Sequence, residues 1–148
     1  MFKKLLSLAL VGIITGMAAT ALADLQKIAV VDVQAVVSKS AQVKALRKER
    51  EAKSQELVKF INNAGADIKK QTDPKKKEEL AKKYEKELNA KKEANAKAYK
   101  TKLQAIDKSI SDTITSQAKA MGYDIVLTKG VVLYGGDDIT EAVSKVVK

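Results

Sequence analysis

Short apolar clusters stand at both ends of the chain, and they predict the strands of a small sheet. Residues 27–32 (KIAVVD) are apolar on both faces, which is typical of a strand that is buried from both sides. Near the other end, residues 123–128 (YDIVLT) and 131–134 (VVLY) flank the two-residue connection Lys129-Gly130. This spacing predicts a β-hairpin.

A short helix is predicted at the end of the sequence. The pair Gly135-Gly136 is followed by Asp138 and Glu141, a D-x-x-E spacing in which two carboxylates cap the first N–H groups of a helix. We therefore expect a helix over about residues 139–147, with an apolar stripe that needs a sheet to cover it. This role explains the acidic residues as a turn and a cap rather than as a cation site.

The long middle segment, residues 40–121, almost lacks strand and turn signals and predicts two helices. Apolar residues recur at spacings of three and four, as in a helical seam, although Arg50 and Lys53 occupy two seam positions of the first helix. The stripe of the second helix is nearly lost over residues 91–98. The apolar seam positions are Val43, Leu46, Leu57, Phe60 and Ala64, then Leu80, Tyr84, Leu88, Tyr99, Leu103, Ile106, Ile110, Ile114 and Met121.

The turn between these helices is predicted at Asp73-Pro74. Asp is a natural N-cap, and the fixed φ of Pro suits the first helical position. Asn62, Asn63 and Gly65 are poor helix formers, so the first helix ends either there or at the turn.

The lengths of these helices decide the fold class. At 1.5 Å per residue they would reach about 50 Å and 72 Å, which is longer than a compact domain of this size. We therefore expect an α+β fold. A small strand body (residues 24–39 and 103–148) would carry a long antiparallel helical arm (residues 40–102).

Charge is distributed unevenly between these two parts. The chain carries 28 Lys and Arg against 18 Asp and Glu, a net charge of +10. Residues 39–102 hold 20 basic and 10 acidic side chains, whereas the body has a net charge of −2. Solvation of long helices explains abundant charge but not this excess, and a positive projection attracts acidic chains and anionic lipid surfaces.

The first 23 residues have the pattern of a secretory signal. Lys3 and Lys4 precede the apolar run over residues 5–18, and Ala21-Leu22-Ala23 is a small-residue cleavage pattern. We expect cleavage after Ala23 and export of the mature chain.

Composition excludes several classes of function. The sequence has no His, Cys or Trp, so the commonest metal ligands, thiol nucleophiles and His-centred triads are all absent. The acidic residues are dispersed, without paired-carboxylate or Gly-rich phosphate motifs. We therefore expect no enzyme activity, no cofactor and no metal site. The small body, with open strand edges, favours an oligomer.

The order of elements resembles the Skp/OmpH family of periplasmic chaperones for outer-membrane proteins. The matching stretches are KIAVVDVQAVVSKS at residues 27–40, the charged helical hairpin, and GYDIVLTKGVVLYGGDDITEAVSKVVK at residues 122–148. The resemblance implies a homotrimer whose arms surround a cavity and hold unfolded β-barrel precursors without ATP.

The resemblance assigns expected roles to two groups of residues. Strand residues would build the body and its trimer contacts: Ile28, Val30, Ile125, Leu127, Val132, Leu133 and Tyr134. Basic and apolar positions of the arm would bind the unfolded client protein: Lys53, Leu57, Lys59, Phe60, Ile61, Ile68, Lys69, Lys70 and Tyr84. Weak contact of the basic arm with an anionic membrane surface is a further expectation.

Two other classes remain as alternatives. A structural coiled-coil protein of the envelope, such as an adhesin stalk or a tether, needs long helices but neither a basic excess nor a strand body. A nucleic-acid-binding protein would fit the net charge, but the export signal argues against it. Arg47 and Arg50 are also the only arginines, whereas base recognition relies on Arg.

Overall fold

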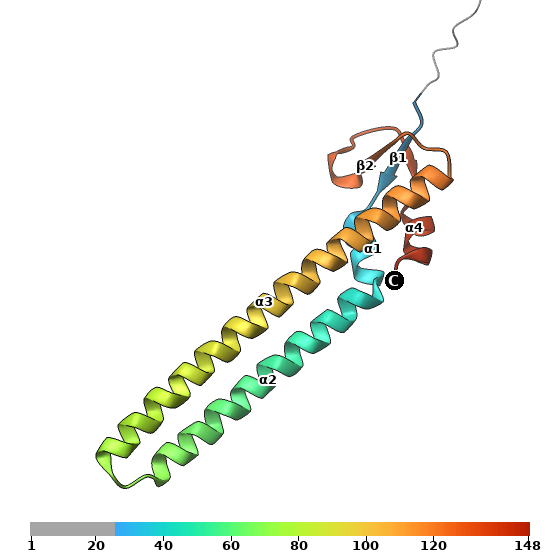
Figure 1. Ribbon diagram of the computed structural model, residues 1–148. Helices are drawn as coiled ribbons and strands as arrows, with labels where there is room; N and C mark the ends of the chain where they lie inside the picture. The colour runs from blue at the N-terminus through green and yellow to red at the C-terminus, as the bar shows by residue number, and fades with distance from the viewer. Residues whose placement is uncertain (1–25) are drawn as a thin grey trace, which may run out of the picture.

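The computed structural model describes residues 26–148, and the predicted signal segment lies outside them. Figure 1 shows a small body at one end of two long helices that lie side by side. In chain order the elements are β1 (Ile28–Val31), α1 (Val33–Lys39), α2 (Ala41–Lys70), α3 (Pro74–Ala120), β2 (Ile125–Thr128), the 3₁₀ turn η1 (Lys129–Val131), β3 (Asp137–Asp138) and α4 (Thr140–Val146). The α+β fold class is confirmed.

The sheet has three strands in the order β2-β1-β3, and both neighbours pair with β1 in parallel. Ile28 lies opposite Ile125, and Val30 lies opposite both Leu127 and Asp138. The strand from the start of the chain is therefore the centre of the sheet. Its two neighbours come from the last quarter of the sequence. The body is therefore formed by the chain segments before and after the two arm helices.

The predicted β-hairpin is wrong. Lys129 and Gly130 belong to the 3₁₀ turn η1, and residues 132–134 are not a strand. Tight hairpin turns require a positive φ at one or both central residues, and among the described residues only Gly122, Gly135 and Gly136 have one. Because residues 129 and 130 lack this geometry, no strand pairs back antiparallel to β2, and the chain instead passes β1 to form β3 on its far side.

Gly136 fits where the chain returns to the sheet. Its φ is +83°, and a Cβ atom there would lie 2.6 Å from Cγ2 of Val30 and 3.4 Å from the Ile28 carbonyl oxygen. The glycine thus supplies both the left-handed backbone and the close approach of β3 to β1.

The core of the body lies between one face of the sheet and the helices. It contains Ala29 and Val31 of β1, Val36 of α1, Ile110 and Ala118 of α3, and Ile139 and Val143 at α4. Helix α1 was not predicted, because residues 33–39 were assigned neither to the strand over residues 27–32 nor to the helix after residue 40. Asp32 starts it, and its Oδ1 accepts a hydrogen bond of 3.0 Å from the Ala35 N–H.

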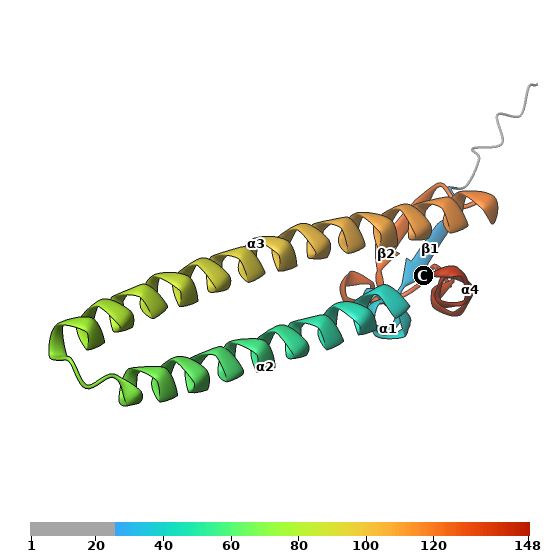
Figure 2. The same cartoon turned by 60° about the horizontal axis from the view of Figure 1, so that its bottom comes forward.

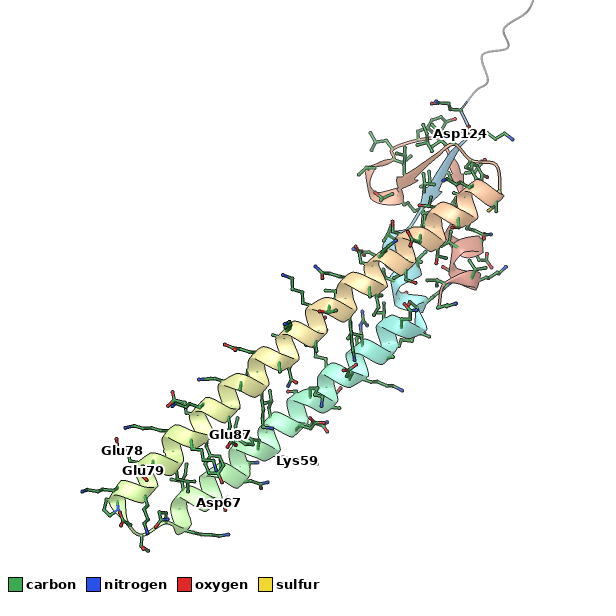
Figure 3. All side chains as sticks on the ribbon, viewed as in Figure 1. Lys59, Asp67, Glu78, Glu79, Glu87 and Asp124 are labelled. Carbon is green, nitrogen blue, oxygen red and sulfur yellow. The ribbon has the colours of Figure 1, made fainter. Side chains whose placement is uncertain are left out.

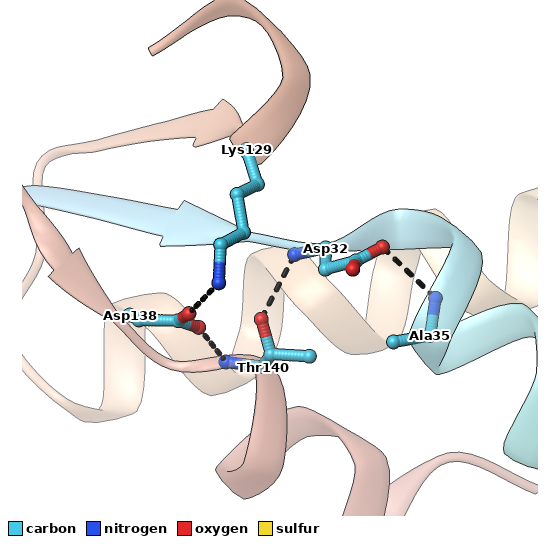
Figure 4. A network of polar contacts seen from close by, with 5 residues as sticks. All are labelled: Asp32, Ala35, Lys129, Asp138 and Thr140. Carbon is cyan, nitrogen blue, oxygen red and sulfur yellow. Dashed lines mark hydrogen bonds and ion pairs between the residues drawn. The ribbon is translucent and has the colours of Figure 1, made fainter. Parts of the chain in front are cut away.

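The C-terminal helix is confirmed, but its predicted D-x-x-E cap forms only in part, because Glu141 does not contribute to it. Ile139 is the N-cap residue and makes no side-chain cap, while Glu141 pairs with Lys145 one turn later. Asp138 instead accepts hydrogen bonds from Lys129 Nζ at 2.8 Å and from the Thr140 N–H at 2.9 Å. Figure 4 shows this network, in which Thr140 Oγ1 also accepts the Asp32 N–H.

The arm consists of two continuous helices. Helix α2 has 30 residues and runs through residues 62–65 without a break, which places its end at the predicted turn. Asp73 caps α3 by accepting from the N–H groups of Lys75 and Lys76, with Pro74 at the first turn, as predicted. Figures 1 and 2 show α2 alongside the first part of α3, while the last turns of α3 pack on the body.

Candidate functional site

The arm is held together by a sparse seam. Within residues 40–102 the buried side chains are Ser40, Leu46 and Ala64, and most other positions are exposed. Figure 3 shows side chains standing out from both helices along the whole length of the arm. The arm therefore offers a large, highly charged surface rather than a packed domain.

An aromatic contact joins the helices in the outer half of the arm. The rings of Phe60 and Tyr84 meet edge to face with their centres 5.7 Å apart. The Tyr84 hydroxyl donates a 2.8 Å hydrogen bond to Asp67 Oδ2, which raises the pKa of Tyr84 above its usual value. Lys91 Nζ lies 5.2 Å from the centre of the Phe60 ring. Phe60 and Tyr84, which were both predicted to bind the client, thus link the two helices.

A second link lies nearer the body. The guanidinium of Arg50 lies 5.3 Å from the centre of the Tyr99 ring, in a cation–π contact. Lys102 donates to both carboxylate oxygens of Glu49 across the seam. The predicted site residues did not include Arg50, Lys91 or Tyr99. One signal was present in the sequence: Arg50 is a charged residue at a position of the seam where an apolar residue is expected.

The predicted arm residues fall into two sets. Those that face the partner helix are partly covered, namely Lys53, Leu57, Phe60, Ile68 and Tyr84. Those that face outward are exposed, namely Lys59, Ile61, Lys69 and Lys70. Glu56 bonds to Lys53 at 2.7 Å and raises its pKa, so this lysine is paired. The structure does not gather all nine into one pocket.

The predicted body residues also divide by exposure. Val30 is only 5% exposed, because Gly136 packs against it. Ile125 and Val132 are partly covered, while Ile28 and Leu127 are 37% and 38% exposed. Leu133 and Tyr134 are fully exposed. We call the three exposed apolar side chains Val131, Leu133 and Tyr134 the apolar rim.

The described residues contain few other chemical groups that could form a site. In residues 26–148 no three Asp or Glu side chains gather in a way that could hold a metal ion. None of the helices over the same residues has an apolar stretch long enough to cross a membrane. The functional candidates are therefore the two surfaces, the arm and the apolar rim.

Comparison with known proteins agrees with this architecture. The family model described as Outer membrane protein (OmpH-like) matches residues 27–147, which include every helix and strand of the body and the arm. No curated protein matches the chain at a significant level. Since the family model covers far more than half of the sequence, the chain belongs to the OmpH-like outer membrane protein family.

Proposed function

We propose that this chain is an ATP-independent holding chaperone of the periplasm. It binds unfolded outer-membrane β-barrel precursors in a basic cavity between helical arms and prevents their aggregation. One observation carries the proposal: the excess of positive charge lies on a long exposed hairpin, residues 39–102, and not on the body. Membership of the OmpH-like family supports the same class of client.

The charge of the arm provides the first step, recruitment. Acidic unfolded chains are attracted over a distance of about a Debye length, roughly 8 to 10 Å near physiological salt. Most of the lysines are exposed, including Lys59 and Lys69, so they remain hydrated and interact weakly. Each contributes about 0 to 1 kcal/mol. Many weak contacts permit release without ATP. The same charge would support weak contact with an anionic membrane surface.

Assembly into a trimer would follow from the apolar rim. Leu133 and Tyr134 expose their whole side chains in the connection between the two edge strands, β2 and β3. Burial of such residues between copies stabilises the assembly by about 25 cal/mol per Å² of apolar surface. A body shared by three copies would set three arms around one space. No enzymatic step or cofactor enters this function.

Export completes the proposal. Residues 1–23 would direct the chain to the periplasm, with cleavage after Ala23. Mass spectrometry of the exported protein should then find Asp24 as the first residue.

Aggregation of a denatured outer-membrane barrel protein, diluted out of urea, tests the holding function. The mature chain at stoichiometric amounts should suppress light scattering in the absence of nucleotide. Failure to suppress it would favour a structural coiled-coil role.

A charge-reversed variant tests recruitment. Replacement of Lys53, Lys59, Lys69 and Lys70 by Glu takes the charge of residues 39–102 from +10 to +2. Association with the acidic client should then slow severalfold, and association of the parent should weaken as salt rises. Rates that stay flat under both changes would mean that recruitment is apolar.

Assembly is tested by Leu133→Asp, with Val58→Asp as control. Both side chains are exposed in the single chain, at 104% and 53%, so neither change should unfold it. Light scattering should show that only Leu133→Asp reduces the oligomer mass. An unchanged mass would exclude the apolar rim from the interface.

A further inference from the structure

The seam of the arm opens near its middle into two adjoining cavities between α2 and α3. The larger has a volume of about 330 Å³, and its apolar lining comes from Leu46, Leu57, Ala96, Ala98 and Tyr99. The smaller, of about 190 Å³, extends toward Phe60. Because Lys53, Leu57 and Asn95 line both, the two form one continuous groove, which we call the seam gap.

The sequence explains why the gap exists. Over residues 91–98 (KKEANAKA) α3 carries no large apolar side chain to fill the space opposite Leu57. The helices are linked on either side of this stretch, by Phe60 and Tyr84 toward the tip and by Arg50 and Tyr99 toward the body. The gap therefore lies between two fixed points, which keep it from closing by a simple approach of the helices.

The charges at the edge of the gap are not equivalent. Glu49 is paired with Lys102, and Glu56 is paired with Lys53. Arg50 and Lys91 lie over the Tyr99 and Phe60 rings, and within residues 26–148 neither forms an ion pair with a carboxylate. The gap thus combines an apolar lining with two cations that remain available to a negative group.

We propose that the seam gap binds one large apolar side chain of an unfolded acidic polypeptide, with a carboxylate of the same polypeptide beside Arg50 or Lys91. This inference rests on the proposed function and adds a defined subsite to it. The larger cavity alone has a volume of about 330 Å³, and an aromatic side chain that leaves water to enter it buries a large apolar area.

The arrangement favours a polypeptide as the occupant. The groove continues from one cavity into the next along the arm. In an extended chain, side chains two residues apart point to the same side at a spacing of about 7 Å. A large apolar side chain can therefore enter one cavity while a carboxylate two residues away reaches a cation at the edge.

The absence of Trp from the chain gives a selective probe. The probe is a twelve-residue unstructured peptide with one central Trp and an Asp two residues away on each side, titrated against the full mature protein. Its fluorescence should shift to the blue as the indole leaves water. A peptide in which Asn replaces both Asp residues should bind at least threefold more weakly and with less dependence on salt.

Two variants of α3 locate the site. Asn95→Leu places an apolar side chain in both cavities, and Asn89→Leu makes the same change at an exposed position that lines neither. Affinity for the Trp–Asp peptide should fall at least tenfold in Asn95→Leu and stay unchanged in Asn89→Leu. Circular dichroism should show both variants as helical as the parent.

Three results would overturn the subsite. One is an unshifted Trp spectrum with the parent, and another is equal binding by Asn95→Leu and the parent. The third is complete displacement of the peptide by laurate at a concentration tenfold lower than that of the peptide. This result would make a fatty acid the occupant. If the parent still suppressed client aggregation in any of these cases, the proposed function would stand without this subsite. Peptide binding without suppression would instead refute the holding function.

Discussion

The body and the arm of this chain are stabilised in different ways. In the body, Ala29, Val36 and Val143 are completely buried in a core that joins strands and helices from both ends of the sequence. In the arm, few side chains are buried between the helices, and the seam contains a gap. The body thus has a closely packed core, whereas the arm has unfilled apolar space and unpaired charge that a partner can contact.

The largest expected effect compares one substitution in the two regions. Val36→Asp places a carboxylate in the fully buried core of the body, and Val58→Asp places it on an exposed face of α2. The first should lower the free energy of unfolding by several kcal/mol, because the charge has no partner there. The second should change it by less than about 0.5 kcal/mol. Urea denaturation measures both, and similar values would contradict the contrast in packing.

Two glycines provide the next comparison. Gly136→Ala forces a side chain into a left-handed position against Val30 and should destabilise the body by more than about 1 to 2 kcal/mol. Gly65→Ala lies within α2 with open space around it, and it should stabilise the arm helix by up to about 1 kcal/mol. Thermal unfolding should therefore shift in opposite directions. Gly130→Ala, in open space without a positive φ, is the control in the body.

Ser40 joins the two regions, and its loss should have an effect of about 1 to 2 kcal/mol. Its buried hydroxyl donates to the Lys148 carbonyl and accepts from the Val43 N–H as the cap of α2. Ser40→Ala removes both bonds. Hydrogen exchange should then increase in the first turn of α2 and at α4, and no increase in either place would show that the joint is unimportant.

The smallest effect concerns pH. Hydrogen bonds from Lys129 and from Thr140 hold the pKa of Asp138 well below its usual value near 4. Since the folded state has the lower pKa, the stabilising charge is present above about pH 4 and is lost as pH falls further. Asp138 is 45% exposed, so Asp138→Asn should cost less than about 1 kcal/mol at pH 7.

Denaturant midpoints of the parent and Asp138→Asn should converge as pH falls from 5 toward 2. A difference that is constant over this range would show that the charge of Asp138 does not contribute.

The sequence predicted the arm better than the body, for physical reasons. Helix periodicity and the Asp73-Pro74 cap are local signals, and both are confirmed. Parallel pairing of β1 with β2 depends on a crossover of almost a hundred residues, whereas the Lys129-Gly130 spacing suggested a local hairpin. The roles of Arg50 and Lys91 depend on the register of α2 against α3, which residue type alone does not give.

The central claim is that the body assembles the oligomer while the arm holds the client. Residues 50–100 can be replaced by a short Gly-Ser turn that keeps Glu49 beside Lys102, the pair that crosses the seam nearest the body. Light scattering should give this variant the same number of copies per oligomer as the parent. Aggregation of the denatured barrel protein should then proceed as if no chaperone were present. Full suppression by the armless oligomer would contradict the claim and move the holding surface to the body.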